Sequence, residues 1–571
     1  MMTVPIFHCT LRLRSYILLV SLLLLSCQQN NEGQRAAELQ STTPSWYANA
    51  VIYNLNVGSF KDSDGDGRGD FKGLTSSLSY LSDLGITAIW LAPFQPSPDQ
   101  DDGYDITDYF GIDKRLGTKE DFQTFMKAAK ARQIHVLMDI VINHTSVEHP
   151  WFKSARADTS GKYHQWYVWA SQKPKDFDQG MVFPGVQTET WTFDEPTGKF
   201  YFHRFYDFQP DLNYQNQEVR LMARDVLRYW LKQGVDGFRL DAVPFVIDKP
   251  ETGAKDPEHM FEILDELTAE IRKVNPEAIL LGEANVAAEE NTDYFGKDAT
   301  RLQMMFNFYA NQYLFYALAK GDPTAYGKAL EEFRDKPSKG QWVHFLRNHD
   351  EIDLDRLEKK QRELVYQRFG PEASMQLYDR GIRRRLAPML VKPELIKVAY
   401  SVLFSAPGAQ MIRYGEEIGM GDDLALRERL SVRTPMQWNE STSGGFSSSK
   451  ETYRPVIAYG GYGYQKINVV RQFKDPQSLL EFVKSMIHLR RQHPEIGLGN
   501  WKIHPSSQLF ILEYQYQDKR LLTVHNFSAE SRTFEPASDL SKDRLRPLLS
   551  GNDGKTIPAY GFQWFNINSG S

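Results

Sequence analysis

The chain has 571 residues, of which 41% are apolar and 25% are charged, and its formal net charge at pH 7 is -6. This length exceeds one ordinary domain, and the composition is that of a folded globular protein. The acidic balance excludes nucleic-acid binding by bulk positive charge.

The first 27 residues have the pattern of a bacterial lipoprotein signal peptide. Arg12 and Arg14 precede an apolar run, residues 16–25, that is too short to span a bilayer as a mature helix. The tetrad Leu24-Leu25-Ser26-Cys27 resembles a lipobox, which predicts that Cys27 is lipidated and that the protein is exported and anchored at the periplasmic face or cell surface. An ordinary signal peptide cleaved nearby is the alternative.

The segment after this leader is polar, and residues 28–45 are predicted to form a flexible tether. The only other cysteine, Cys9, lies in the leader. The mature chain is therefore predicted to have no internal disulfide.

From residue 46 onward, short apolar segments alternate with amphipathic ones. The helical segments include 119–132 and 217–233, and the last is 478–492. The candidate strands are 51–55, 88–91, 136–140, 237–241, 279–283, 303–306, 342–346 and 410–413. Eight such units predict an α/β fold, a parallel (β/α)8 TIM barrel formed by residues 46–144 and 210–498.

Two segments do not fit the barrel pattern. Residues 145–209 are far too many for a loop, and they are rich in aromatic and turn residues. We expect them to form a small inserted subdomain after the third strand. Residues 499–571 contain short β runs and are predicted to form a C-terminal antiparallel β-domain.

An acidic loop follows the first strand. Oxygen-bearing residues stand at alternating positions with Gly67 sixth, as at the beginning of an EF-hand loop, but Gly73 replaces the glutamate of position twelve. The loop predicts a structural divalent cation, calcium, and a solvated acidic turn is the alternative. The candidate metal residues are Asp62, Asp64, Asp66, Arg68 and Asp70. No organic cofactor is predicted.

Polar side chains gather where four predicted strands end, which is where a barrel of this kind carries its active site. One such cluster alone is more simply explained as a structural ion pair. Four clusters on one rim favour a catalytic site. Their members are Asp139, Asn143 and His144 at the end of the third strand, Arg239 and Asp241 at the end of the fourth, Glu283 at the end of the fifth, and Asn348, His349 and Asp350 at the end of the seventh.

These segments, together with Gln209-Pro210-Asp211-Leu212-Asn213, resemble the ordered sequence regions of glycoside hydrolase family 13, the α-amylase family. The resemblance spans nearly the whole mature chain. It implies that Asp241 is the nucleophile and Glu283 the general acid/base. Asp350 is implied as a third carboxylate, which binds sugar hydroxyls in subsite -1.

The same resemblance implies further substrate-binding residues. His144 and His349 are expected in subsite -1, and Arg239 is expected to orient Asp241 and keep it ionised. Tyr104 is implied as a stacking platform, with Asp105 holding the non-reducing glucose end. Arg433 is expected to join Asp105 at the 4- and 6-hydroxyls, which predicts a pocket that admits chain ends and rejects mid-chain binding.

The chemistry requires these residue types. A retaining glycosidase needs one carboxylate to attack the anomeric carbon and one protonated carboxyl group to release the leaving oxygen. Neighbouring carboxylates are expected to keep Glu283 protonated.

Within the family, several segments resemble trehalose synthases more than amylases: 93–98, 101–106, 209–214, 381–388, 417–422 and 432–438. Ala242 after Asp241 resembles members that prefer α-1,4 linkages, whereas Glu428-Arg429-Leu430-Ser431 departs from the subgroup pattern. The resemblance implies isomerisation of maltose to trehalose through a glucosyl-enzyme intermediate. The expected partner is a small α-glucoside, with no nucleic acid and with a membrane contacted only through the lipid anchor.

Two alternatives remain open from the sequence. One is an exported α-glucosidase or α-amylase-type hydrolase of malto-oligosaccharides, which would pass through the same intermediate. The other is a non-catalytic, lipid-anchored glucan-binding protein, which would need neither Asp241 nor Glu283.

Overall fold

The computed structural model describes residues 45–249, 258–536, 540, 544–549 and 555–568. The predicted signal peptide, Cys27 and nearly all of the predicted tether lie outside the described residues. The chain divides into two units, Met1–Ala48 and Asn49–Ser571, and the account below concerns the second. Over the described ranges, no helix is both long and apolar enough to cross a bilayer.

Eight parallel strands close into a barrel in the order β1-β2-β3-β7-β8-β9-β10-β14, and β14 pairs with β1. This confirms the predicted (β/α)8 fold, and each predicted strand end lies within one residue of the observed one. The strands are β1 (Val51–Leu55), β2 (Ala88–Leu91), β3 (His135–Ile140), β7 (Gly237–Leu240), β8 (Ile279–Gly282), β9 (Met304–Phe306), β10 (Gln341–Phe345) and β14 (Ala409–Arg413).

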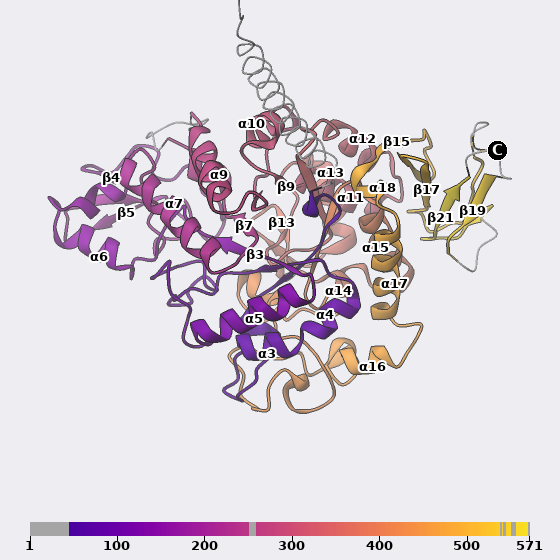
Figure 1. The fold of residues 1–571 in the computed structure, drawn as a ribbon, viewed down its shortest axis with the longest axis horizontal. Coiled ribbons are helices and arrows are strands. Elements are labelled where there is room, and N and C mark those ends of the chain that lie inside the picture. The colour runs from indigo at the N-terminus through magenta and orange to yellow at the C-terminus, as the bar shows by residue number, and fades with distance from the viewer. Residues whose placement is uncertain (1–44, 250–257, 537–539, 541–543, 550–554, 569–571) are drawn as a thin grey trace, which may run out of the picture. The chain divides into compact units, whose positions relative to one another are not determined.

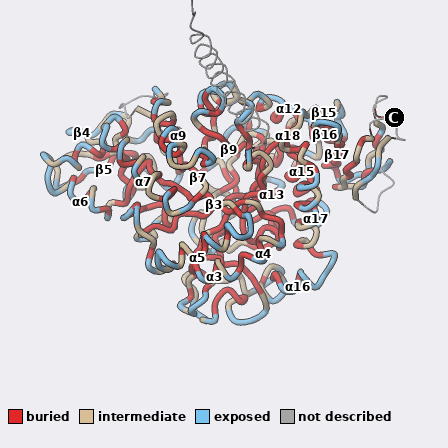
Figure 2. Tube along the Cα trace, viewed as in Figure 1, coloured by how far each residue is buried: buried red, intermediate tan, exposed pale blue. Residues whose placement is uncertain are grey.

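Burial explains why the strands were readable as continuous apolar runs. The strands of a parallel barrel are covered on both faces, so they do not alternate between apolar and polar residues. All five residues of β1 and all four of β7 are buried, and Figure 2 shows the buried trace running through the strands. The helices around them include α5 (Lys119–Ala131), α7 (Gln217–Lys232), α9 (Glu262–Val274), α11 (Phe308–Lys320), α15 (Pro393–Ser405) and α17 (Leu479–Gln492).

Between β3 and β7 the chain forms a small separate layer (Figure 1). It contains α6 (Pro150–Ala157) and an antiparallel sheet of β4 (Trp169–Ala170), β6 (Lys199–Phe202) and β5 (Trp191–Asp194) in that order. Aromatic packing holds it together: the rings of Phe152 and Trp169 stack 5.8 Å apart at 3°. These elements lie inside the range that the sequence assigned to an insert.

The C-terminal region is an antiparallel sheet, as predicted, in the order β15-β16-β17-β21-β19. It packs on α15, where Trp564 donates a hydrogen bond from Nε1 to Ser401 Oγ at 2.9 Å. Its strands are β15 (Asn500–Ile503), β16 (Phe510–Tyr516), β17 (Lys519–His525), β19 (Leu545–Pro547) and β21 (Phe562–Ile567), and β18 (Arg532–Thr533) pairs with β20 (Thr556–Ile557).

An excursion after β10 was not predicted. It contains a helix, α13 (Lys359–Phe369), and a sheet of three two-residue strands, β11 (Ile352–Asp353), β13 (Gly381–Ile382) and β12 (Gln376–Leu377). A two-residue strand is too short to show the alternation of apolar and polar residues by which a strand is recognised in a sequence. The excursion matters because it borders the site described next.

Candidate active site

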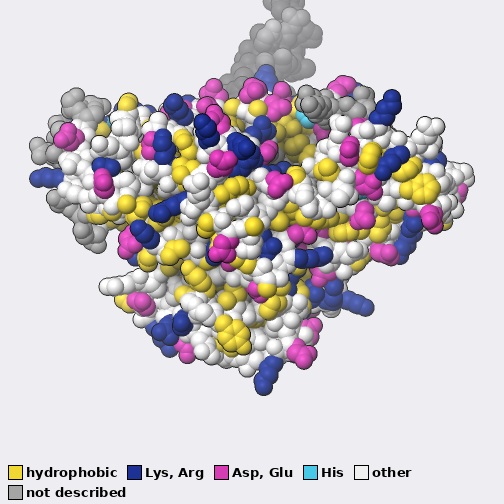
Figure 3. Space-filling model, turned by 180° about the vertical axis from the view of Figure 1, so that it is seen from behind, with side chains coloured by type: hydrophobic (Ala, Val, Ile, Leu, Met, Phe, Trp, Pro, Cys, Tyr) yellow, Lys and Arg dark blue, Asp and Glu magenta, His cyan; other side chains and the backbone are white. Residues whose placement is uncertain are grey.

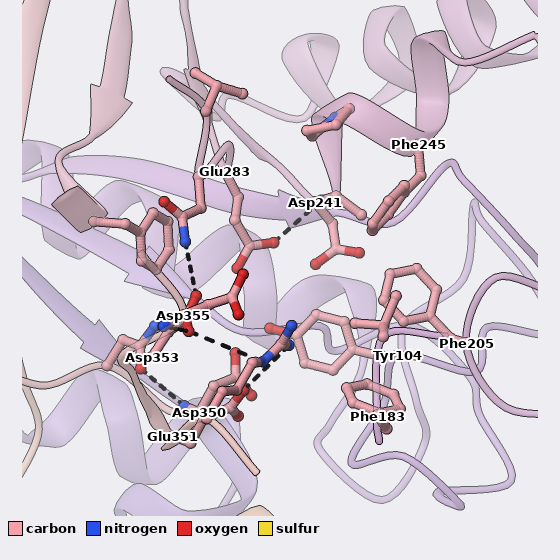
Figure 4. Close-up of a pocket in the computed structure, with 18 of the residues that line it drawn as sticks. Tyr104, Phe183, Phe205, Asp241, Phe245, Glu283, Asp350, Glu351, Asp353 and Asp355 are labelled. Atoms are coloured by element: carbon pink, nitrogen blue, oxygen red, sulfur yellow. Dashed lines mark hydrogen bonds and ion pairs between the residues drawn. The ribbon is translucent and has the colours of Figure 1, made fainter. Parts of the chain in front are cut away.

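A cavity of about 410 Å³ opens at the C-terminal ends of the barrel strands. It brings together seven of the predicted residues: Tyr104, His144, Asp241, Glu283, Asn348, His349 and Asp350. Figure 4 shows Asp241, Glu283 and Asp350 directed into one space, with aromatic rings on one side and carboxylates on the other. On the face drawn in Figure 3, charges of both signs are interspersed.

One buried arginine joins three carboxylates at the base of this cavity. Arg239 Nη1 lies 2.7 Å from Asp139 Oδ1 and 2.6 Å from Asp241 Oδ1, and Nη2 lies 2.6 Å from Glu283 Oε2. The barrel register produces this arrangement, because Asp139 on β3 pairs directly with Arg239 on β7, next to β8. Arg239 is only 1% exposed and therefore acts from behind the cavity wall.

The turn after β7 positions the two carboxylates of Asp241 and Glu283. Ala242 adopts a left-handed conformation (φ 51°, ψ 42°), so the chain turns sharply before α8 (Val243–Ile247) begins. Its backbone N–H is thereby aimed at Glu283, donating to Oε2 at 3.1 Å. A single-residue turn thus orients both side chains.

Burial sets the protonation of this pair. It raises the pKa of Glu283 to about 7, against the lowering effect of Arg239 and with the help of Asp241 and Asp350. It also raises the pKa of Asp241, to about 6, although Arg239 lowers it. Arg239 therefore offsets only part of the burial, and less than the sequence argument assumed. At neutral pH Asp241 remains mainly ionised while Glu283 retains a large protonated fraction.

Asp350 is held in the opposite state. Its Oδ1 lies 2.7 Å from Arg433 Nη2 and 3.1 Å from Arg429 Nη1, and its Oδ2 lies 3.1 Å from His349 Nε2. Burial opposes ionisation, but the contact with His349 and the positive charges of Arg429 and Arg433 outweigh it and hold the pKa of Asp350 well below its usual range. Asp350 is thus a permanent anion in the cavity.

Tyr104 and the two histidines form the adjoining wall. The Tyr104 hydroxyl lies 2.9 Å from Asp139 Oδ2 and 2.7 Å from His349 Nε2, and the Tyr104 and His349 rings are stacked 5.4 Å apart. His144 Nε2 lies 3.1 Å from the Tyr104 carbonyl oxygen. Burial lowers the pKa of His144 to about 4 and that of His349 further, so both rings are neutral.

Asp105 does not line the cavity, contrary to the expectation for a residue holding the terminal glucose. Its carboxylate is turned away and accepts bonds from Ser97 Oγ at 2.8 Å and from the backbone N–H groups of Gln100 and Asp101. Asp101 is the residue that faces the cavity. The segment Asp101-Asp102-Gly103-Tyr104-Asp105 offers three carboxylates, and spacing alone could not select among them.

Arg433 also lies behind the cavity lining. Its guanidinium bridges Asp102 Oδ2 at 3.0 Å and Asp350, and its Nε donates to the His349 carbonyl oxygen at 2.9 Å. Arg429 occupies the lining position instead, 2.9 Å from Asp101 Oδ1. The pair that lines the cavity is therefore Asp101 and Arg429 rather than Asp105 and Arg433.

The outer part of the cavity was missed by sequence reasoning. Asp353 accepts a bond from Asn285 Nδ2 at 2.7 Å, and Arg380 lies 3.6 Å from Glu351. Three of these four residues, Glu351, Asp353 and Arg380, come from the unpredicted excursion after β10. The unpredicted lining residues include Phe183, Phe205, Phe245, Val286, Phe308, Glu351, Asp353, Asp355, Arg356 and Arg380.

The acidic loop after β1 gathers three carboxylates, those of Asp62, Asp64 and Asp70, whose oxygen atoms lie within 4.8 Å of one another. Asp66 is outside this group and accepts a bond from the Arg68 backbone N–H at 2.8 Å. The Arg68 guanidinium, which pairs with Asp99 at 3.0 Å, is itself a cation without an acceptor atom, so this side chain cannot ligate a metal ion. None of these residues lines the cavity.

Comparison with known proteins gives one family. The family described as "Alpha amylase, catalytic domain" matches residues 55–368 and 383–499. A trehalose synthase of Pimelobacter sp. is 36% identical over 92% of this chain and 96% of its own length. The trehalose synthase/amylase TreS of Mycobacterium tuberculosis is 35% identical over 92% and 91%. An oligo-1,6-glucosidase of Bacillus cereus is 28% identical over 90% and 96%.

Solved structures of similar fold include two enzymes that act on sugars. The trehalulose synthase MutB of Pseudomonas mesoacidophila superposes with a TM-score of 0.76 at 25% identity, covering 92% of this chain and 100% of that one. A trehalose-6-phosphate hydrolase of Bacillus licheniformis gives a TM-score of 0.75 at 26% identity, with the same coverage.

Proposed function

The chain belongs to the α-amylase family, and from this we propose that it is a trehalose synthase-like enzyme that acts on maltose and isomerises it to trehalose. The observation that carries the proposal is the joint placement of Asp241 and Glu283 on Arg239 inside the cavity, in a chain whose similar relatives include trehalose synthases over nearly their full length. A binding-only protein would have no use for this pair.

In the proposed reaction, Asp241 attacks the anomeric carbon of the non-reducing glucose while Glu283 protonates the bridging oxygen. The released glucose stays in the cavity and turns. Its anomeric hydroxyl then attacks the glucosyl-Asp241 ester, and Glu283 takes back the proton. Attack by water at the same carbon yields two glucose molecules instead.

The inner end of the cavity supports a preference for short substrates. Asp101, Asp350 and Arg429 form a linked polar wall there, since Arg429 contacts both carboxylates. Groups held in this way suit the terminal hydroxyls of a glucose. A site built to bind such hydroxyls discriminates strongly against sugars that lack them.

Product analysis after incubation with maltose tests the proposal. Trehalose is expected as the main early product, with free glucose accumulating more slowly, and soluble starch should react far less than maltose. Glucose alone would favour the hydrolase alternative. A ladder of internal fragments from starch would contradict the closed inner end.

The activity should depend on pH in a bell-shaped manner. Asp241 must be ionised and Glu283 protonated, so kcat/KM is expected to rise with pH as Asp241 deprotonates near 6 and to fall as Glu283 deprotonates near 7. Ionisation of Asp350 should not shape this pH profile, because its pKa lies far below the pH range of the assay. Initial rates between pH 4 and 9 at low maltose check this, and a flat profile across neutral pH would refute the assigned protonation states.

We also propose that the acidic loop binds a structural calcium ion through Asp62, Asp64 and Asp70. Carboxylate oxygens within one small space are the ligands that calcium prefers. Burial opposes ionisation of Asp62, but bonds from Ser447 and from the backbone N–H groups of Gly65 and Gly67 lower its pKa, so a full negative charge faces its neighbours.

Calcium removal should lower the thermal stability of the protein. A ligand bound only by the folded state stabilises by about 2.7 kcal/mol at 100 times its Kd, so a chelator should reduce Tm by several degrees and added calcium should restore it. Asp62→Asn should abolish this response, whereas Asp158→Asn, at an exposed acidic turn, should retain it. A Tm indifferent to chelator and calcium would exclude the site.

We further propose that Cys27 anchors the exported protein to a bacterial membrane. The support is the Leu24-Leu25-Ser26-Cys27 sequence after a short apolar run. Labelled palmitate fed to producing cells should enter the wild type and should not enter Cys27→Ala. A wild type that takes up no label and fractionates as soluble would overturn the proposal.

A further inference from the structure

Three loops that are distant in sequence meet beside the cavity, and one carboxylate joins them. Glu428, in the segment after β14, accepts hydrogen bonds at Oε2 from the hydroxyl groups of Tyr378 (2.7 Å) and Tyr206. Tyr378 comes from the excursion after β10, and Tyr206 from the insert between β3 and β7. The two hydroxyl groups also lie within 3.3 Å of each other. We call Tyr206, Tyr378 and Glu428 the three-loop bridge.

The bridge is backed by a ring that lines the cavity. Phe183 lies 4.8 Å from the ring of Tyr206 and 4.8 Å from that of Tyr378, at 29° and 33°. The Arg429 guanidinium lies 4.7 Å from the Phe183 ring centroid. Phe183 and Arg429 both line the cavity, and Figure 4 shows Phe183 on the aromatic side of it. The bridge therefore touches the cavity wall from outside.

Arg429 links the three-loop bridge to Asp101 and Asp350 at the inner end of the cavity. It follows Glu428 directly in sequence, and its guanidinium contacts Asp101 at 2.9 Å and Asp350 at 3.1 Å. A shift of Glu428 would therefore move the cation that organises both carboxylates. None of the three bridge residues lines the cavity itself.

The backbone indicates that the bridge is imposed rather than incidental. Tyr378 and Asp379 are the central residues of the turn closed by the Arg380 N–H to the Leu377 carbonyl oxygen, and both have positive φ, 57° and 54°. Such turns favour Gly, Asn or Asp, so tyrosine is a poor choice for the turn alone. Glu428 also has a positive φ, 42°. Residues stay in such conformations only where surrounding contacts fix them.

We propose that Glu428 is a positioning residue that fastens the three loops over the cavity and thereby favours transfer of the glucosyl group to the retained glucose over transfer to water. The inference rests on the proposed function. Both outcomes break the same Asp241–anomeric carbon bond and pass one proton to Glu283, and they differ only in the attacking oxygen. A looser junction of the loops admits water and releases glucose, and both effects raise hydrolysis.

The product ratio from maltose provides the first test. Glu428→Ala, Tyr206→Phe and Tyr378→Phe should each lower the ratio of trehalose to glucose, by about tenfold for Glu428→Ala because it loses both bonds to a charged group. Total maltose turnover should change much less. Tyr201→Phe is the matched control: it removes a hydroxyl that donates to the Asp207 carbonyl oxygen at 2.7 Å, within the same insert, and it should leave the ratio unchanged.

A double-mutant cycle separates the bridge from general damage. If the hydroxyl of Tyr206 acts through Glu428, then Tyr206→Phe should have little further effect in the Glu428→Ala background. Fully additive effects would overturn the inference. So would an equal loss of turnover and of trehalose in all variants, with an unchanged ratio.

Hydrogen–deuterium exchange keeps the inference distinct from the proposed function. Glu428→Ala should increase amide exchange in peptides containing Tyr206 and Tyr378 together, and Tyr201→Phe should not increase it around Tyr378. If the wild type makes no trehalose, the proposed function fails. The bridge is then judged by exchange and by a faster hydrolysis of maltose in Glu428→Ala, and unchanged exchange overturns it in either case.

Discussion

Asp241→Ala and Glu283→Gln are each expected to abolish nearly all turnover of maltose while the protein remains folded. Loss of the nucleophile removes the covalent intermediate, so kcat should fall by about 10⁴-fold or more. Loss of the acid should lower it by about 10² to 10⁴-fold, the range of general acid catalysis. Both variants should retain the wild-type circular dichroism spectrum.

Azide distinguishes the two roles. In Asp241→Ala the small anion can occupy the vacated space and attack the opposite face of the sugar from the departing group, so an activated α-glucoside should yield β-glucosyl azide. In Glu283→Gln the intermediate still forms on Asp241, and azide should yield α-glucosyl azide. The reverse assignment, or activity near that of the wild type in either variant, would contradict the roles given to these residues.

Arg239→Leu is expected to have the largest effect on stability. It leaves Asp139, Asp241 and Glu283 around an apolar side chain with no cation, and breaking a buried ion pair in this way costs about 3–5 kcal/mol. Activity should fall with it, because Asp241 loses the group that favours its ionised form. Urea unfolding at pH 8 measures the loss of stability.

The loss of stability in Arg239→Leu should increase with pH. Without Arg239 the pKa values of the three carboxyl groups rise further in the folded state, above those of the unfolded chain. A raised carboxyl pKa destabilises at high pH, and the penalty is relieved as pH falls through the folded-state value. The stability difference from wild type should therefore be smaller at pH 5 than at pH 8. Arg471→Leu, which removes an exposed pair with Glu440, should cost at most about 1 kcal/mol at either pH.

Sequence reasoning was sufficient for the barrel because its strands are buried on both faces. Each one is a short run of apolar residues, and the pattern ends where a polar residue such as Asp241 or Glu283 begins the rim. The excursion after β10 could not be found in this way. Its strands β11, β12 and β13 have two residues each, and their pairing is fixed by contacts that are distant in sequence.

The site shows the same division. Asp241, Glu283 and Asp350 end different strands of one barrel, so topology alone brings them together. Asp101 and Asp105 lie in one loop, and which of them faces the cavity depends on local hydrogen bonds. The backbone N–H groups of Gln100 and Asp101 hold the Asp105 carboxylate away from the cavity, and no residue pattern predicts these hydrogen bonds.

The cluster of three carboxylates around Arg239 also determines the source of the proton that is used during turnover. Arg239 supplies a single positive charge to Asp139, Asp241 and Glu283, and burial raises the pKa of each of these acids, so the cluster retains a proton near neutral pH. That proton leaves Glu283 when the first sugar bond breaks and returns when the second forms. Isomerisation therefore neither takes up nor releases a net proton. The enzyme can complete a cycle without proton exchange with bulk solvent, and the cavity can stay closed throughout the reaction.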